Sequence, residues 1–286
     1  PRPKGGVMKK IETDTCIIGG GSGGLSLAAG AVQMGARVVL FEGGQMGGDC
    51  LNSGCVPSKA LLAAAKAAYL ANGNTAMGIT NTPPNIDFAA VKAHIAGVIA
   101  QIEPHDSIAR FEALGVTVIP EMAHFTGPRA VESAAHQVRA KYFVIASGSQ
   151  PMLPSIPGLD HTDFFSNATI FADWEKPDHL LIIGGGPIGV EMAQAHARLG
   201  CEVTLIEASH IMGRDDSALV EILKQNLINA GITLIERVRV TSLSQTIKSG
   251  RRTITAILSN GNQLTASHLF IAVGREPALD GLQLTA

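Results

Sequence analysis

The sequence predicts an α/β protein in which one β-turn-α-β unit occurs twice. Glycine-rich turns follow short apolar strands at residues 19–24 and 184–189, and each turn leads into a helical stretch. In each copy the next strand ends on an acid, Glu42 or Glu207, at the same distance from the first glycine. This repeated spacing favours a duplicated domain over a chance run of glycines.

The first unit has the features of a dinucleotide site. Glycines at positions 19, 21 and 24 permit a tight turn and bring a pyrophosphate close to the start of the helix. The acid at the end of the second strand can hold ribose hydroxyls. Its elements are expected at residues 11–18 (strand), 25–34 (helix) and 37–41 (strand), after a loose tail over residues 1–10.

The second unit repeats these features, with a strand at 179–183, a helix ending near Leu199 and a strand at 201–206. A single glycine-rich turn is weak evidence, but two copies with strand, helix and terminal acid in register indicate two bound dinucleotides.

Between the two units, Cys50 and Cys55 stand five positions apart before a helical stretch. On an unbroken helix their Cα atoms would lie roughly 8 to 9 Å apart, whereas a disulfide tolerates about 7 Å. The backbone must therefore bend at residues 52–54, where Asn, Ser and Gly favour turns. Two buried thiols or a structural bridge are the alternatives, and a metal pair is disfavoured because no second Cys or His pair has ligand spacing.

Position gives the two sulfurs unequal properties. A thiolate at a helix N-terminus is stabilised by the unpaired N–H groups, and Lys59 follows Cys55 by one turn. Cys55 is therefore expected to be the better-stabilised thiolate.

Composition bounds the class of protein. With 286 residues, 46% hydrophobic and 16% charged, the chain has room for about two domains with real cores. A net charge of −2 and the lack of a long apolar run indicate neither nucleic acid nor a membrane as partner. Four cysteines indicate a reducing compartment, the cytoplasm, and Cys16 and Cys201 are expected to be buried and inert.

The remaining elements complete two Rossmann-like, three-layer dinucleotide-binding domains, each with a small antiparallel β insertion. A third helix begins at Pro104, and its His105, Asp106 and Arg110 are interpreted as a solvated face. The Pro-rich segment 150–159 is expected to separate the domains. Further elements are expected as a helix to about 71, a loop at 72–86, a helix at 87–102, strands at 141–146, 232–235, 252–258, 263–265 and 268–272, and a helix at 215–230.

Three motifs together resemble the flavoprotein disulfide reductases, the family of dihydrolipoamide dehydrogenase, glutathione reductase and mercuric reductase. The central one is Gly47-Gly48-Asp49-Cys50-Leu51-Asn52-Ser53-Gly54-Cys55-Val56-Pro57-Ser58-Lys59. The others are Ala146-Ser147-Gly148-Ser149-Gln150-Pro151 and Ala272-Val273-Gly274-Arg275-Glu276-Pro277. The resemblance extends from Ile11 to about Pro277.

The resemblance implies an FAD/NAD(P)-binding fold, with FAD in a domain over 11–150, NAD(P)H in a domain over 151–275 and a return to the first domain over 276–286. Electrons would pass from nicotinamide to flavin to Cys55, the charge-transfer thiolate. Cys50 would then attack the substrate. Lys59 would stand by the reactive nitrogen of the flavin, paired with Glu191.

The implied cofactor sites share glycine turns, ribose-binding acids and strand ends. NADH is favoured over NADPH because Glu207 repels a 2′-phosphate and Ala208-Ser209-His210 brings no paired arginines. The predicted FAD-binding residues are Gly19, Gly21, Ser22, Gly24, Glu42, Gly48, Asp49, Ser147 and Gly148, and the predicted nicotinamide-nucleotide residues are Gly184, Gly186, Ile188, Gly189, Glu207 and Gly274.

Two departures from the family pattern bear on function. Asp49 replaces a threonine, and unless it is protonated or turned away its carboxylate should raise the pKa of Cys50. The chain also ends before the segment in which the family carries a second flavin contact, a dimerisation domain and an acid/base histidine. We therefore expect a fragment of a protein that is a homodimer at full length.

Two functions are open from the sequence. The first is an oxidoreductase acting on dihydrolipoamide or another small disulfide or dithiol, with mercuric-reductase-like or quinone (diaphorase) activity as variants. The second is a non-catalytic nucleotide-binding redox sensor, in which Cys50 and Cys55 report redox state to a partner.

Overall fold

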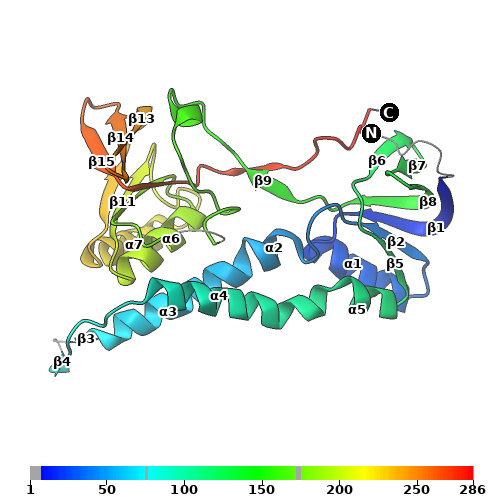
Figure 1. Ribbon diagram of the computed structural model, residues 1–286, viewed down its shortest axis with the longest axis horizontal. Coiled ribbons are helices and arrows are strands. Elements are labelled where there is room, and N and C mark those ends of the chain that lie inside the picture. Colours follow the sequence, from blue (N-terminus) through cyan, green and yellow to red (C-terminus); the bar gives the residue numbers. More distant parts are fainter. Residues whose placement is uncertain (1–7, 75–76, 172–174, 286) are drawn as a thin grey trace. The chain divides into compact units, whose positions relative to one another are not determined.

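The computed structural model describes residues 8–74, 77–171 and 175–285 (Figure 1). Residues 1–7 of the expected tail lie outside these ranges. The chain divides into two compact units: unit 1 comprises residues 1–56, 97–150 and 277–286, and unit 2 comprises residues 57–96 and 151–276. No helix within the described ranges is long and apolar enough to cross a bilayer.

Unit 1 is built on a six-stranded sheet in the order β5-β2-β1-β8-β7-β6. The first four strands are parallel, and β7 and β6 extend the sheet as an antiparallel hairpin. This hairpin is the expected small insertion. The strands are β1 (Lys9–Ile18), β2 (Val38–Phe41), β5 (Val116–Ile119), β6 (His124–Gly127), β7 (Ala130–Glu132) and β8 (His136–Ile145).

The central strands of unit 1 are buried on both faces, as their continuous apolar runs require. Ile17 and Leu40 pack with residues of helices α1 (Ser22–Gln33) and α5 (Ile108–Ala113). Cys16 and Phe41 point to the opposite side and pack with residues of the antiparallel strands. The alternation of side chains along each strand thus supplies two cores to one sheet.

The redox stretch forms two helices with a break between them. Helix α2 (Gly48–Asn52) ends at Ser53, and helix α3 (Cys55–Ala71) begins two residues later. The expected bend is therefore present, but Cys50 lies within a short helix that the sequence did not predict. The chain continues through strands β3 (Gly73–Asn74) and β4 (Ile79–Thr80), helix α4 (Phe88–Ile102) and the 3-10 helix η2 (Glu103–Asp106).

Unit 2 repeats the architecture. Its parallel sheet has the order β12-β11-β10-β16, and helix α6 (Pro187–Arg198) follows β10 as α1 follows β1. Helix α7 (Ser217–Asn229) begins at Asp216, whose carboxylate accepts the N–H groups of residues 218 and 219. The strands are β10 (His179–Ile183), β11 (Glu202–Glu207), β12 (Thr233–Glu236) and β16 (His268–Ile271).

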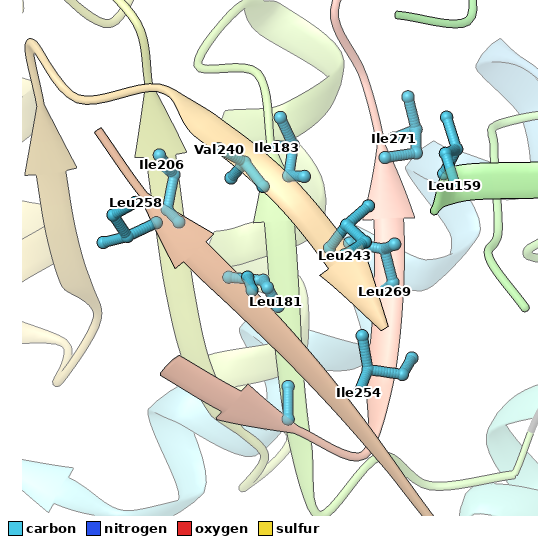
Figure 2. Packing of buried hydrophobic residues seen from close by; sticks show 12 residues of the cluster. Leu159, Leu181, Ile183, Ile206, Val240, Leu243, Ile254, Leu258, Leu269 and Ile271 are labelled. Carbon is cyan, nitrogen blue, oxygen red and sulfur yellow. The ribbon is translucent and has the colours of Figure 1, made fainter. Parts of the chain in front are cut away.

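A three-stranded antiparallel sheet, β13-β14-β15, forms the third layer of unit 2. Figure 2 shows its apolar side chains, among them Leu243 and Ile254, facing Leu181 and Leu269 of the parallel sheet. The cluster is closed to water, because Leu181, Ile254 and Leu269 have no exposed surface. The strands are β13 (Val240–Lys248), β14 (Arg251–Leu258) and β15 (Gln263–Ala266).

The predicted α/β class with two Rossmann-like, three-layer domains is confirmed, and three details differ. Strand β1 begins at Lys9, so two residues of the expected tail are paired with β8. Strand β13 was not predicted. Residues 57–96 group with unit 2 rather than with the first domain, and within that unit Lys59 pairs with Glu191 while the Arg198 guanidinium lies 4.6 Å from the ring centre of Tyr69.

The chain passes between the units within helices α3 and α4 and again at two short strands, β9 (Ser149–Pro151) and β17 (Arg275–Pro277). Each stands inside one of the two motifs that the sequence placed at domain crossings. The 3-10 helix η3 (Leu159–His161) follows the first crossing.

Candidate active site

The two glycine turns have the same geometry. Gly19 and Gly184 both have a φ of +111°, and a Cβ on either would lie 2.2 or 2.3 Å from a backbone oxygen of the neighbouring strand end. A Cβ on Gly24 or Gly189 would lie 1.9 Å from the carbonyl oxygen of the first glycine. These glycines let the helix pack directly against the turn, as a dinucleotide-binding unit requires.

In unit 1, seven of the nine predicted FAD-binding residues line one cavity of about 320 Å³. The backbones of Gly48 and Gly21 are in close contact there, since a Cβ on Gly48 would lie 2.7 Å from the Gly21 Cα. A second cavity of about 480 Å³ shares Gly19, Glu42 and Ser147 with it. The seven residues are Gly19, Gly21, Glu42, Gly48, Asp49, Ser147 and Gly148.

These cavities fit the adenine nucleotide end of FAD. The first N–H groups of α1 have no side-chain cap at Gly21, which leaves them to a phosphate. The Glu42 carboxylate accepts the N–H groups of Gly20 and Gly44, both at 2.6 Å. A carboxylate has about four acceptor positions, so Glu42 keeps capacity for ribose hydroxyls. Ser22 and Gly24 do not line either cavity.

In unit 2, four of the six predicted nicotinamide-nucleotide residues line a cavity of about 850 Å³: Gly186, Ile188, Glu207 and Gly274. The Glu207 carboxylate accepts N–H groups from Gly185 at 2.7 Å and Ser209 at 2.8 Å, the same arrangement as at Glu42. Gly184 and Gly189 do not line the cavity, and their close backbone contacts shape the turn. Helix α6 also lacks a side-chain cap, so a second dinucleotide fits here.

The nicotinamide-nucleotide cavity holds residues that the sequence reasoning missed. Arg214 lines it together with Glu207, as does His210, which the sequence weighed only for its lack of paired arginines. Arg214 lies four residues beyond that segment, in the turns before α7. The sequence feature that could have indicated Arg214 is its position directly before the Asp215-Asp216 pair at the start of a helix.

Cys50 and Cys55 are brought together across the break between α2 and α3. Neither is joined in a disulfide, and the Cys50 thiol interacts with both the side chain and the backbone of Cys55. Cys50 is half-buried and Cys55 is exposed. The pair is therefore placed to form a disulfide or to share a proton.

Burial and the side chain of Cys55 raise the pKa of the Cys50 thiol, a hydrogen bond with the Cys55 backbone opposes them, and the Asp106 carboxylate adds a smaller raising effect. Asp49, which the sequence predicts to raise this pKa unless it is turned away, is not among these causes. Its Oδ1 accepts the hydroxyl of Ser53 at 2.7 Å, which ties the carboxylate to its own helix. The sequence reasoning missed Asp106, which it assigned to a solvated helical face.

Lys59 and Glu191 form an ion pair within unit 2. The Lys59 Nζ lies 2.6 and 2.9 Å from the two carboxylate oxygens of Glu191. The remaining two cysteines are of another kind: Cys16 is fully buried and Cys201 nearly so, and burial raises the pKa of both thiols to about 12. Among the described residues, no three metal-ligating side chains gather in one place.

Two dinucleotide cavities and a dithiol at a helix break define the class of protein, a nucleotide-dependent disulfide oxidoreductase. Residues 13–286 match the model of the family described as pyridine nucleotide-disulphide oxidoreductase. The chain belongs to this family, whose cofactors are FAD and NAD(P)H.

Curated relatives include mercuric reductases and dihydrolipoyl dehydrogenases. The chain is 35% identical to the mercuric reductase of Streptomyces lividans over 95% of its own length and 58% of the relative's. It is 32% identical to the dihydrolipoyl dehydrogenase of Thermus scotoductus, over 95% of the chain and 59% of the relative. The chain thus spans somewhat over half the length of these relatives.

Among solved structures, the chain resembles the HOCl-induced flavoprotein disulfide reductase RclA from Escherichia coli. The TM-score is 0.81 at 27% sequence identity, and the match covers 94% of this chain and 58% of that one. A Cu(II) complex of RclA matches equally well.

Proposed function

We propose that this chain passes electrons from NADH through FAD to the Cys50/Cys55 pair and on to a small disulfide, or takes them from a small dithiol in the reverse direction, most like dihydrolipoamide dehydrogenase. The observation that carries the proposal is the interaction of Cys50 with Cys55 across a helix break, with no disulfide between them. The two nucleotide cavities supply the electron source.

FAD, when bound, relays the electron pair of the nicotinamide to the disulfide. Reduction of a Cys50–Cys55 disulfide by two electrons and one proton breaks the sulfur–sulfur bond and leaves one thiol and one thiolate. One hydride equivalent from NADH therefore balances the step without another reductant.

The two sulfurs take different roles in this scheme. Cys55 begins the 17-residue helix α3, whose N-terminal N–H groups stabilise a thiolate. Cys50 carries the proton and attacks the substrate once it is deprotonated.

Lys59 and Glu191 are proposed to act on the flavin. A cation near the flavin favours the anionic reduced form of the flavin. The Lys59 ammonium donates to both carboxylate oxygens of Glu191, which fixes the position of the lysine side chain.

Glu207 supports a preference for NADH. Its carboxylate lines the nucleotide cavity and would repel a 2′-phosphate. Arg214 lines the same cavity, and its guanidinium would attract a 2′-phosphate. The preference for NADH over NADPH is therefore expected to be moderate.

Reduction of Hg(II) is a second candidate. The chain is 31 to 35% identical to several mercuric reductases, and paired thiolates are soft ligands that suit such an ion. In this reading Cys50 and Cys55 would bind the metal as substrate rather than exchange disulfides.

The test is a panel of acceptors: lipoamide, glutathione disulfide, Hg(II) and a quinone. Each is assayed with NADH and the FAD-loaded protein, as wild type, Cys50→Ser and Cys16→Ala. Cys16→Ala is the matched control, because Cys16 is buried and lies outside the pair.

We expect turnover of a small disulfide that falls at least a hundredfold in Cys50→Ser and persists in Cys16→Ala, with quinone reduction kept in both. Turnover of Hg(II) alone would favour the second candidate. Disulfide turnover that survives Cys50→Ser, or reduced thiols with no acceptor turned over, would overturn the proposal, the latter in favour of a redox sensor.

A further inference from the structure

Arg237 lies beside the nicotinamide-nucleotide cavity, on the segment that directly follows β12. Its N–H donates to the Ser209 carbonyl at 3.0 Å, and the next N–H, that of Val238, donates to the Glu207 carbonyl at 3.3 Å. Both acceptors belong to residues that line the cavity. The segment is therefore fixed against the turn that follows β11, although the two are far apart in the chain.

The backbone of Arg237 has a conformation that is unfavourable for a residue with a Cβ. Its φ is +58°, in the left-handed region that glycine and asparagine adopt most readily. The hydrogen bond from its N–H to Ser209 holds it there. Residues kept in such conformations cluster at functional sites. The presence of an arginine at this place points to a role for its side chain.

The guanidinium of Arg237 lies against the ring of His210. Its Nε and Nη2 are each 3.4 Å from the His210 Nε2. Because arginine has only donors, Nε2 is the acceptor and the ring proton is on Nδ1, which faces the Glu236 carboxylate at 3.6 Å. The other oxygen of that carboxylate lies 2.7 Å from the Lys224 ammonium. His210 lines the cavity, so the guanidinium is one side chain away from it.

The charges that line the cavity balance one another. Among its described lining residues, the acids are Glu207 and Asp215, and the lysines and arginines are Arg214 and Arg275. Arg237 adds a positive charge next to this balanced set, on the side of the turn that begins at Glu207. This is the ribose end of a bound dinucleotide, because the acid that ends the second strand holds the ribose hydroxyls.

We propose that Arg237 is a specificity-determining residue whose guanidinium, held against His210, favours a nucleotide with a phosphate at the 2′ position. Glu207 repels that phosphate, and Arg237 together with Arg214 offsets the repulsion, so that the chain accepts NADPH as well as NADH. The two arginines that are absent directly after Glu207 are thus supplied by two other segments. The inference rests on the proposed function for the use of this cavity.

The test compares two ligands that differ only in the 2′-phosphate, adenosine 5′-monophosphate and adenosine 2′,5′-bisphosphate. Their dissociation constants are measured by calorimetry on the FAD-loaded protein, in which the first dinucleotide site is occupied. Neither NADH nor an electron acceptor is present. The ratio of the two constants isolates the effect of the 2′-phosphate, since a general change in the cavity alters both constants.

The variants Arg237→Asn and Arg237→Gly remove the charge and suit the left-handed backbone, and Arg237→Lys is the conservative rescue. Arg239→Asn is the matched control, because Arg239 is an exposed arginine of the same segment whose N–H is bound by the Ser259 hydroxyl. Melting temperatures identify a variant that fails to fold, and the two neutral replacements then substitute for one another.

We expect both neutral Arg237 variants to weaken binding of the bisphosphate, relative to the monophosphate, by roughly three- to tenfold at low salt, and by less at about 0.5 M salt. Arg239→Asn should keep the wild-type ratio, and Arg237→Lys should stay closer to wild type than Arg237→Asn does.

An unchanged ratio in both neutral variants, or an equal change in Arg239→Asn, would overturn the inference and leave the proposed function standing. If neither ligand binds the wild-type protein, the inference and the nucleotide site of the proposed function fail together.

Discussion

Lys59 of helix α3 and Glu191 of helix α6 stand 132 positions apart in the chain, yet both carboxylate oxygens lie within 3 Å of the lysine ammonium. The Lys59 side chain is 59% exposed and that of Glu191 is 34% exposed. Exposed ion pairs contribute about 0 to 1 kcal/mol to stability, so stability alone gives little reason for this contact. The proposed role of Lys59 beside the flavin predicts an effect of this pair on reduction rather than on stability.

Lys59→Met should slow reduction of the bound flavin by NADH by roughly tenfold or more, because the cation that favours the reduced flavin is lost. The melting temperature should change by only a few degrees. Rapid-mixing measurements of flavin bleaching under anaerobic conditions give the rate.

Lys66→Met is the control for the lysine variant, since Lys66 is exposed on the same helix. Equal rates for the two variants would show that Lys59 has no special effect on the flavin.

Gly24→Ala should destabilise unit 1 by roughly 2 to 4 kcal/mol and weaken FAD binding. Its Cβ would lie 1.9 Å from the Gly19 carbonyl oxygen, so the turn must move. Gly30→Ala, on the same helix with nothing within 4 Å of the added Cβ, should instead stabilise by about 0.5 to 1 kcal/mol. Urea unfolding of both variants checks the contrast, and a Gly24→Ala protein as stable as wild type would contradict it.

Glu207→Gln should lower kcat/KM for NADH by roughly tenfold or less and raise it for NADPH, because the charge that repels a 2′-phosphate is removed while one acceptor for the Gly185 and Ser209 N–H groups remains. Arg214→Gln should have the opposite effect on NADPH, since its guanidinium lines the same cavity. Steady-state rates with both nucleotides test this, and an unchanged NADH to NADPH ratio in both variants would refute it.

His196 should make the protein less stable as the pH falls below about 6.5. The His196 side chain is fully buried, and burial lowers its pKa to about 4. Its Nδ1 donates to the Met192 carbonyl at 2.8 Å. Between pH 6.5 and pH 4 the unfolded state takes up a proton that the folded state does not. The free energy of unfolding therefore falls as the pH approaches 4, by about 3 kcal/mol in all.

Urea unfolding at pH 7 and pH 4.5 measures the acid-dependent loss, and His196→Asn should reduce it. His94→Gln, which removes an exposed histidine, should leave the loss as in wild type. If His196→Asn keeps the full acid dependence, another group is responsible.

The fold follows from sequence where local patterns decide it. Both β-turn-α-β units were predictable because glycines, apolar strands and terminal acids repeat in register. Strand β13 could not be predicted, because a register shift between Val240 and Ser242 breaks its alternation of buried and exposed side chains and Ile247 is 63% exposed.

The site follows from sequence only in part. Cys50, Cys55 and the glycine turns lie within short motifs, and the structure brings most of the predicted cofactor residues to two cavities. The position of Asp106 near Gly47 could not be predicted, because the contact joins segments far apart in the chain and η2 has the sequence pattern of a solvated helix. The Ser53 hydroxyl donates to Asp49, and the orientation of these two side chains could not be predicted from the sequence alone.

The most direct test of the proposed function is anaerobic titration of the FAD-loaded protein with NADH, followed at the long-wavelength absorbance of a thiolate next to oxidised flavin. Wild type and Cys50→Ser should show this band, and Cys55→Ser should not, because Cys55 supplies the thiolate. A band that never forms in wild type, or that survives Cys55→Ser, would contradict electron transfer from nicotinamide through flavin to the Cys50/Cys55 pair.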